Sequence, residues 1–202
     1  VKIAVDMVKE KLISKKEAIL RIDPNTLDTL LHPTLDEESS LNVIANGLPA
    51  SPGAASGKVV FTSEEAERLT GMMQDTILVR VETSPEDIQG MHAAKGILTA
   101  RGGMTSHAAV VARGMGRPCV SGSSEIDINY ENKSFKTSSM EIREGEIITI
   151  DGSTGRIISG SVATVKPEIS GDFSKLMSWA DNFRKLNIRT NSETPKDTKT
   201  AK

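Results

Sequence analysis

The hydrophobic and polar positions along this chain of 202 residues change their period between the N-terminal segment and the middle. Residues 1–22 carry apolar side chains at helical spacing, and Ser14 followed by Glu17 forms a capping-box pattern that predicts a second helix start. Further along, continuous apolar runs bounded by turn residues occupy 57–62, 76–81 and 96–100. Runs of this length and composition indicate buried strands.

Short helical patterns separate these strands. The segment "EEAERLTG" predicts a helix closed by Gly71, and Ser84 followed by Pro85 has the pattern of an N-cap and a first helical residue. Residues 141–160 read as paired strands, with "DGSTG" as their turn. Strands that alternate with short helices and finish in a β-rich end predict a compact α/β domain over residues 41–164.

The two flanks differ from this domain. We assign residues 1–40 to a helical end followed by a linker, and residues 165–202 to a linker helix followed by a short strand at 187–191. The apolar residues of the C-terminal helix are Phe173, Leu176, Trp179 and Phe183, and we interpret the Trp179 face as a docking surface for a neighbouring domain. Both ends of the sequence lie inside structural patterns, so we expect a piece of a longer enzyme.

Composition excludes several classes of function. The net charge is −2 with both signs interspersed, so no basic stripe predicts nucleic-acid binding. No apolar run is long enough for a membrane span. The single cysteine, Cys119, rules out an internal disulfide and a cysteine-only zinc site. We therefore expect a cytoplasmic protein, or one from an organelle with a reducing interior.

The stretch "RGGMTSHAAVVAR", residues 101–113, contains the candidate catalytic and phosphate-binding residues. Gly102 and Gly103 allow a sharp turn whose N–H groups approach a ligand closely, and the helix that follows begins with unpaired N–H donors. Thr105 and Ser106 add hydroxyl groups. This combination suits a phosphate dianion, and the neutral imidazole of His107 is a suitable nucleophile for a phosphoryl group.

Arg101 and Arg113 flank His107 and are candidates to neutralise phosphate charge, although spacing alone leaves open which of them reaches it. The alternative is that His107 only caps or packs the helix. The residues by themselves leave these two readings evenly balanced.

The other candidate motifs give weaker indications of a catalytic or binding role. In "SPGAASGKV", Pro52 and Val59 replace residues that a phosphate-binding P-loop requires, so we predict a turn into a strand. We expect Cys119 to be buried and inert, and His32 and His92 to be surface or packing residues. Glu82, Glu86 and Asp87 form an acidic group near a strand end, and the last two fit a helix start better than acid–base catalysis. No cluster predicts a metal site.

The segment "GGMTSHAAVVARGMGRPCVSG" resembles the phosphohistidine signature of the phosphoenolpyruvate-utilising enzymes. "RIDPNTLDTLLHP" resembles the segment that leaves the nucleotide-binding domain in that family, and "WADNFRKLNIRTNSETPKDTKTA" resembles the entry into its pyruvate-binding barrel. The resemblance thus covers nearly the whole chain. It implies an α/β fold, namely a compact swivelling phosphohistidine domain with a sheet or barrel-like core and short helices, flanked by helical linker segments.

The resemblance also implies a carrier mechanism. A nucleotide-binding domain would transfer the β-phosphoryl group of ATP to His107 while inorganic phosphate takes the γ-phosphoryl group. The domain would then swivel on linkers at 34–40 and 165–175 to phosphorylate pyruvate, giving phosphoenolpyruvate. Thr105 matches a threonine that a regulatory protein phosphorylates in plant members of the family. Mg²⁺ would be needed by the complete enzyme at sites outside this chain, and the full-length protein would be a homodimer.

Met104 and both flanks resemble the family member that uses ATP, phosphate and pyruvate together. The alternatives are the equivalent domain of phosphoenolpyruvate synthase or of enzyme I of the sugar phosphotransferase system, which more usually have arginine at that position. A third alternative is a non-catalytic swivelling or docking module in which His107 is structural. In each case, the chain alone is not expected to turn over.

Overall fold

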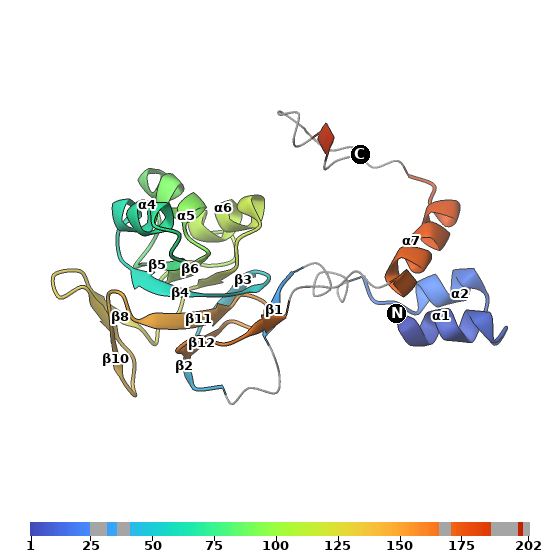
Figure 1. The fold of residues 1–202 in the computed structure, drawn as a ribbon, viewed down its shortest axis with the longest axis horizontal. Helices are drawn as coiled ribbons and strands as arrows, with labels where there is room; N and C mark the ends of the chain where they lie inside the picture. Colours follow the sequence, from blue (N-terminus) through green and yellow to red (C-terminus); the bar gives the residue numbers. More distant parts are fainter. Residues whose placement is uncertain (25–31, 36–40, 166–170, 187–197, 200–202) are drawn as a thin grey trace. The chain divides into compact units, whose positions relative to one another are not determined.

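A computed structural model describes residues 1–24, 32–35, 41–165, 171–186 and 198–199 (Figure 1). The chain forms two compact units, one made of Val1–Asp23 with Ile169–Lys202 and the other of Pro24–Glu168. The two ends of the chain thus share a unit, which differs from the separate N-terminal and C-terminal segments expected from the sequence.

The described part of the first unit contains the helices α1 (Lys2–Lys9), α2 (Lys15–Leu20) and α7 (Gly171–Phe183). The capping box is confirmed, because Ser14 Oγ accepts the Glu17 N–H at 3.2 Å and the Glu17 carboxylate accepts the Ser14 N–H at 2.8 Å. Helix α7 packs against both N-terminal helices. The Lys15 ammonium lies 5.6 Å from the centroid of the Trp179 ring, so this chain itself contributes a cation to the predicted docking surface. The strand expected at 187–191 lies outside the described residues.

The second unit is built on an eight-stranded sheet. Its strands, in spatial order, are β2 (Val43–Asn46), β12 (Arg156–Ser159), β11 (Ile147–Asp151), β4 (Ala54–Val60), β5 (Thr76–Arg80), β6 (Gly96–Thr99), β7 (Cys119–Ser121) and β3 (Leu48–Ser51). Strands β4 to β7 are parallel, and the remaining neighbours pair antiparallel. The turn expected at "DGSTG" joins β11 to β12, as predicted.

The sheet curls until its two edges meet. Strands β2 and β3 lie at opposite ends of the strand order, although only Gly47 separates them along the chain. The Gly47 N–H donates to the Gly155 carbonyl at 2.8 Å, and a Cβ atom on Gly47 would lie 2.7 Å from Val120. The expected α/β fold with a central sheet and short helices is therefore confirmed, and Gly47 provides a residue without a side chain where β2 passes into β3.

Helices α4 (Ser63–Gly71), α5 (Ile88–Ala93) and α6 (His107–Met115) cover one face of the sheet (Figure 1). The predicted start after Ser84 is also present, as a 3₁₀ turn (η1, Pro85–Asp87) that leads into α5. Apolar residues of these helices and of the central strands form one core, which includes Leu78, Ile97 and Ala109. The small side chains of α6 allow it to pack closely on the parallel strands.

A second sheet lies against the opposite face and was not predicted as such. It consists of β8 (Asp127–Asn129), β9 (Ser134–Lys136) and β10 (Glu141–Arg143). Phe135 and Ile142 from this sheet join the core that contains Val79 and Leu98. Segment 141–143 was expected to pair with the strands that follow it, but it pairs with β9. Residues 127–143 are mostly polar, so their hydrophobic pattern is too weak to predict this pairing.

The second unit extends beyond the expected limits of 41 and 164. Strand β1 (Thr34–Leu35) pairs antiparallel with β13 (Thr164–Val165), and Leu35 is buried with Val162. Thr34 and Leu35 thus belong to the folded unit rather than to the expected linker at 34–40, because their burial attaches them to the domain. Residues 36–40 and 166–170 of the two proposed linkers lie outside the described residues, and Gly171 already begins α7.

Candidate functional site

His107 is the first residue of α6 and follows the connection from β6. Because β5, β6 and β7 run parallel, their carboxyl ends meet at the same edge of the sheet. Loops at this edge of an α/β sheet are the usual place for a ligand. The His107 side chain is partly exposed there, at a helix start.

The glycine turn before His107 depends on Gly102. This residue has a φ of +110°, and a Cβ atom on it would lie 2.9 Å from Ser106 Cβ and 3.1 Å from Ser121 Oγ. A Cβ atom on Gly103 would meet nothing within 4 Å. Gly122 was not singled out from the sequence, yet it has a φ of +63° and a Cβ atom on it would lie 2.3 Å from the Gly102 carbonyl oxygen. The close approach thus requires Gly102 and Gly122, and Gly103 is not needed for it.

Hydroxyl groups connect the helix start to the strand ends. Ser106 is the N-cap of α6, and its Oγ accepts the Ala109 N–H at 3.4 Å. The same Oγ lies 3.3 Å from Ser121 Oγ, which in turn lies 3.2 Å from Thr99 Oγ1. Thr99 and Ser121 are fully buried, and Thr99 Oγ1 also donates to the Arg101 carbonyl at 2.8 Å. This chain of hydroxyls holds the turn and the helix in one arrangement.

One nitrogen of the imidazole ring has a partner. His107 Nδ1 lies 3.0 Å from Thr83 Oγ1, in the connection that follows β5. No described residue forms a hydrogen bond with Nε2. Sequence reasoning missed Thr83, because it lies 24 positions before His107 and only the pairing of β5 with β6 brings the two loops together. The partnered Nδ1 orients the ring and leaves Nε2 available.

The two candidate arginines differ in their contacts. Arg113 Nε donates to the Ala109 carbonyl at 3.1 Å, and its terminal NH2 group donates to the Met104 carbonyl. Arg113 therefore fastens α6 to the glycine turn. The Arg101 side chain is exposed and has no hydrogen-bond or ion-pair partner among the described residues. Of the two, Arg101 is the cation that remains available for a ligand.

The start of α6 can receive an anion. The N–H groups of His107 and Ala108 have no acceptor within the helix, and the positive end of the helix dipole lies at the same place. Thr105 is exposed beside them, and Ser106 is partly exposed. The start of α6 thus offers N–H donors and hydroxyl groups next to His107 in the chain, and the Arg101 guanidinium on the preceding turn is unpaired among the described residues.

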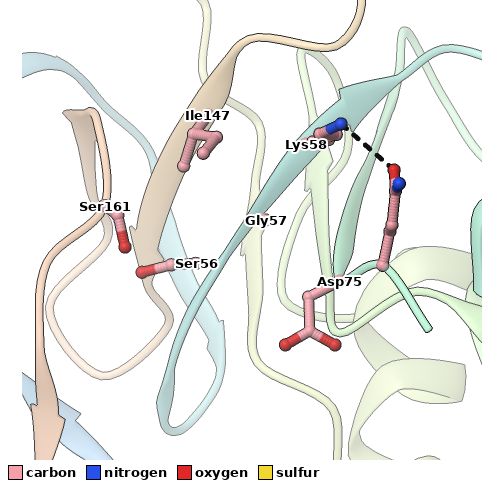
Figure 2. Close-up of a pocket in the computed structure, with 7 residues that line it drawn as sticks. Ser56, Gly57, Lys58, Asp75, Ile147 and Ser161 are labelled. Carbon is pink, nitrogen blue, oxygen red and sulfur yellow. Dashed lines mark hydrogen bonds between the residues drawn. The ribbon is translucent and has the colours of Figure 1, made fainter.

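The other sequence candidates have structural roles. Figure 2 shows Lys58 on β4, where its Nζ donates to Gln74 Oε1 at 3.1 Å, in a shallow pocket that Ser56 and Asp75 also line. A lysine on a strand and paired in this way is no P-loop lysine, as predicted. Among the residues that the structure describes, no group of three or more histidine, cysteine or acidic side chains could hold a metal ion. None of the helices described is long and apolar enough to span a membrane.

The acidic group near β5 also behaves as expected. Asp87 is buried, and its carboxylate accepts the Ser84 N–H at 2.9 Å and the Ser63 hydroxyl at 3.0 Å. It also lies 3.4 Å from Arg80 Nε. Asp87 thus fixes the start of η1, whereas Glu82 and Glu86 are exposed.

Cys119 is buried in β7, and this burial raises the pKa of its thiol to about 12. The thiol therefore stays protonated at neutral pH, and only the thiolate reacts rapidly with alkylating reagents. We expect iodoacetamide to leave the folded chain unlabelled at neutral pH and to label it fully in denaturant. Mass spectrometry gives the readout, and rapid labelling of the folded chain would contradict this burial.

Comparisons with known proteins find similarity over the whole chain. Residues 72–155 match the family described as PEP-utilising enzyme, mobile domain. Over 201 residues the chain is 58% identical to a pyruvate, phosphate dikinase from Rhizobium meliloti (strain 1021), covering 100% of this chain and 22% of that protein. It is 55% identical over 198 residues to the protein of the same name from Clostridium symbiosum, covering 97% and 23%.

Similarity extends to plant proteins. Pyruvate, phosphate dikinase 2 from Zea mays is 54% identical over 199 residues, with 98% of this chain and 22% of that protein covered. The chain therefore spans less than a quarter of the length of these relatives, and the matches include both flanks as well as the His107 segment.

Proposed function

We propose that this chain is the phosphoryl-carrier segment of a pyruvate, phosphate dikinase, because residues 72–155 match the family described as PEP-utilising enzyme, mobile domain. The complete enzyme would convert ATP, inorganic phosphate and pyruvate reversibly into AMP, pyrophosphate and phosphoenolpyruvate. The observation that carries the proposal is the placement of His107 at the start of α6, with Nδ1 on Thr83 and Nε2 unpartnered. Relatives with the dikinase name favour this activity over phosphoenolpyruvate synthase, enzyme I or a docking module.

The chemistry follows from the two ring nitrogens. We take the Nδ1–H group as the donor in the contact with Thr83 Oγ1, so that the lone pair lies on Nε2. Nε2 attacks phosphorus, an N–P bond forms, and the bond from phosphorus to the donor oxygen breaks with its electron pair left on that oxygen. When phosphoenolpyruvate is the donor, the leaving group is the enolate of pyruvate, which then takes a proton at carbon. In the opposite direction the enolate oxygen attacks phosphorus, and the N–P pair returns to Nε2.

The surroundings of His107 would stabilise the transferred group. A phosphoryl dianion on His107 would accept hydrogen bonds from the N–H groups at the start of α6 and from the Ser106 and Thr105 hydroxyls. The Arg101 guanidinium would add a positive charge. We assign Arg101 to the phosphoryl group, because its side chain is unpaired among the described residues, and Arg113 to holding the turn. Thr105 would act as a regulatory site, since a phosphate on it would repel a second one on His107.

The partners follow from the carrier role. The nucleotide-binding and pyruvate-binding domains of the same protein would exchange the phosphoryl group with His107, and tethering would make each encounter intramolecular. Mg²⁺ would bind in those partner domains, and the complete protein would be a homodimer.

The arginine assignment predicts two different outcomes. Arg101→Ala should slow phosphorylation of His107 by roughly 10- to 100-fold, the worth of one charge-assisted hydrogen bond, and leave the free energy of unfolding unchanged. Arg113→Ala should lower the free energy of unfolding by about 1 kcal/mol, because two backbone contacts are lost. Labelling rates and denaturant unfolding measure both effects. A larger rate loss in Arg113→Ala, with unchanged stability, would reverse the assignment.

The proposed function is tested by transfer from radiolabelled phosphoenolpyruvate. The chain is mixed with the separately produced pyruvate-binding domain, and an acid-labile, base-stable label is expected on the chain. If a chain of confirmed fold takes no label, while the same pyruvate-binding domain labels the matching segment of the Rhizobium meliloti relative, the docking alternative holds. In the full-length protein, pyrophosphate release that requires inorganic phosphate separates the dikinase from the other two enzymes.

A further inference from the structure

The contact between Thr83 and His107 depends on a short connection, residues 81–84, between β5 and η1. This connection is held at both ends by hydrogen bonds. At one end the Ser84 N–H donates to the Asp87 carboxylate at 2.9 Å, and at the other the Val81 N–H donates to Tyr130 Oη at 2.9 Å. Thr83 lies between these two points, so its position is set by both.

Tyr130 comes from the second sheet, in the turn between β8 and β9. Its ring packs edge-on against Phe61, with centroids 6.4 Å apart, and the Arg80 guanidinium carbon lies 5.4 Å from its centroid. Arg80 is fixed in turn, because it donates to the Phe61 carbonyl at 2.9 Å and faces Asp87. The hydroxyl that holds Val81 therefore belongs to a well-anchored ring.

Val81 also contacts the glycine turn. Its carbonyl accepts the Arg101 N–H at 2.9 Å, immediately before Gly102. The backbone of Val81 is thus the point where the Tyr130 hydroxyl meets both loops of the site, the one that carries Thr83 and the one that leads to His107.

From these contacts we propose that Tyr130 is a positioning residue for phosphoryl transfer at His107. Its hydroxyl fixes the Val81 amide, which holds Thr83 Oγ1 against Nδ1 and thereby keeps the proton on Nδ1 and the lone pair on Nε2. This inference rests on the proposed function of His107. The second sheet thus has a role in the site through Tyr130, although it contributes no residue to the turn at Gly102 or to the start of α6.

The test is Tyr130→Phe, which removes the hydroxyl and keeps the ring. Tyr130 is 42% exposed, so water can replace the hydroxyl at Val81 and the variant should fold. We expect the nitrogen NMR signals of His107 to change from the Nδ1–H tautomer to a mixture. We also expect labelling from saturating phosphoenolpyruvate to slow roughly three- to tenfold, the worth of one neutral hydrogen bond. Glu131→Gln, an exposed change in the same turn, should alter neither readout.

A double-mutant cycle shows whether Tyr130 acts through Thr83. Thr83→Val should produce the same tautomer mixture, and adding Tyr130→Phe to it should cause no further slowing. Rate losses that multiply, or a Tyr130→Phe chain with the wild-type tautomer and rate, would overturn the inference. The tautomer signal needs no phosphoryl donor. An unlabelled wild-type chain would therefore refute the proposed function, while the NMR comparison would still decide whether Tyr130 positions the ring.

Discussion

Replacing His107 with alanine should abolish the phosphoryl label, with a fall of at least about 10³-fold relative to the wild type, as expected when a catalytic nucleophile is removed. No neighbour can take over the reaction, since the nearby Thr83 and Ser106 hydroxyls are weak nucleophiles without an adjacent base. The label is measured after incubation with phosphoenolpyruvate and the pyruvate-binding domain, by its stability in base and loss in acid.

The matched control is His92→Asn, which changes an exposed imidazole in α5. This variant should retain the full label. His107→Ala should also keep its free energy of unfolding within about 0.5 kcal/mol, since a partly exposed side chain away from the core is removed. A label that persists at the wild-type level in a folded His107→Ala chain would place the phosphoryl group on another residue and end the carrier proposal.

The second large effect is expected for Gly102→Ala. At a φ of +110° the new methyl group would lie 2.9 Å from Ser106 Cβ and 3.0 Å from Ser106 Oγ. Relief of this clash must move the N-cap of α6, so we expect a loss of about 1–3 kcal/mol in the free energy of unfolding. Labelling of His107 should fall more than about tenfold, because displacements of about 1 Å carry such costs at a reacting atom.

Gly103→Ala is the control for this prediction. A Cβ atom at that position meets nothing within 4 Å, and its φ lies outside the range that disfavours other residues. Its free energy of unfolding should match the wild type. Equal destabilisation in both variants would show that the turn has another geometry. A stable Gly103→Ala chain with slow labelling would instead show that Gly103 makes room for the phosphoryl group.

Local sequence signals predicted the elements that depend on neighbouring residues. The capping box at Ser14 and Glu17 and the start after Ser84 are satisfied by atoms within three residues. The continuous apolar runs identified the parallel strands, because a strand covered on both faces needs no polar side chains. The sequence did not predict the pairing of the strands in segment 127–143. These strands are short and polar and pair mainly with one another, so they lack a continuous apolar run.

The segment around His107 was also recognisable from the sequence, because the glycine turn, the hydroxyls and the histidine are contiguous. The residues from other elements that support this segment were not recognised from the sequence. Thr83, Thr99, Ser121, Gly122 and Tyr130 come from other elements. For a threonine or a tyrosine in a loop, no local sequence pattern predicts the hydrogen-bond partner.

The sequence by itself determined the helix starts, the buried strands and the candidate nucleophile, since each depends on the chemistry of residues close along the chain. Only the tertiary structure decided which imidazole nitrogen is partnered, which arginine is already engaged, and that the N-terminal and C-terminal helices form one unit. The imidazole contact and the helical unit arise where strand pairing and the packing of separate segments bring distant residues together. The Arg113 contacts are local, but the pattern of apolar and polar residues does not determine which carbonyl groups a long side chain meets.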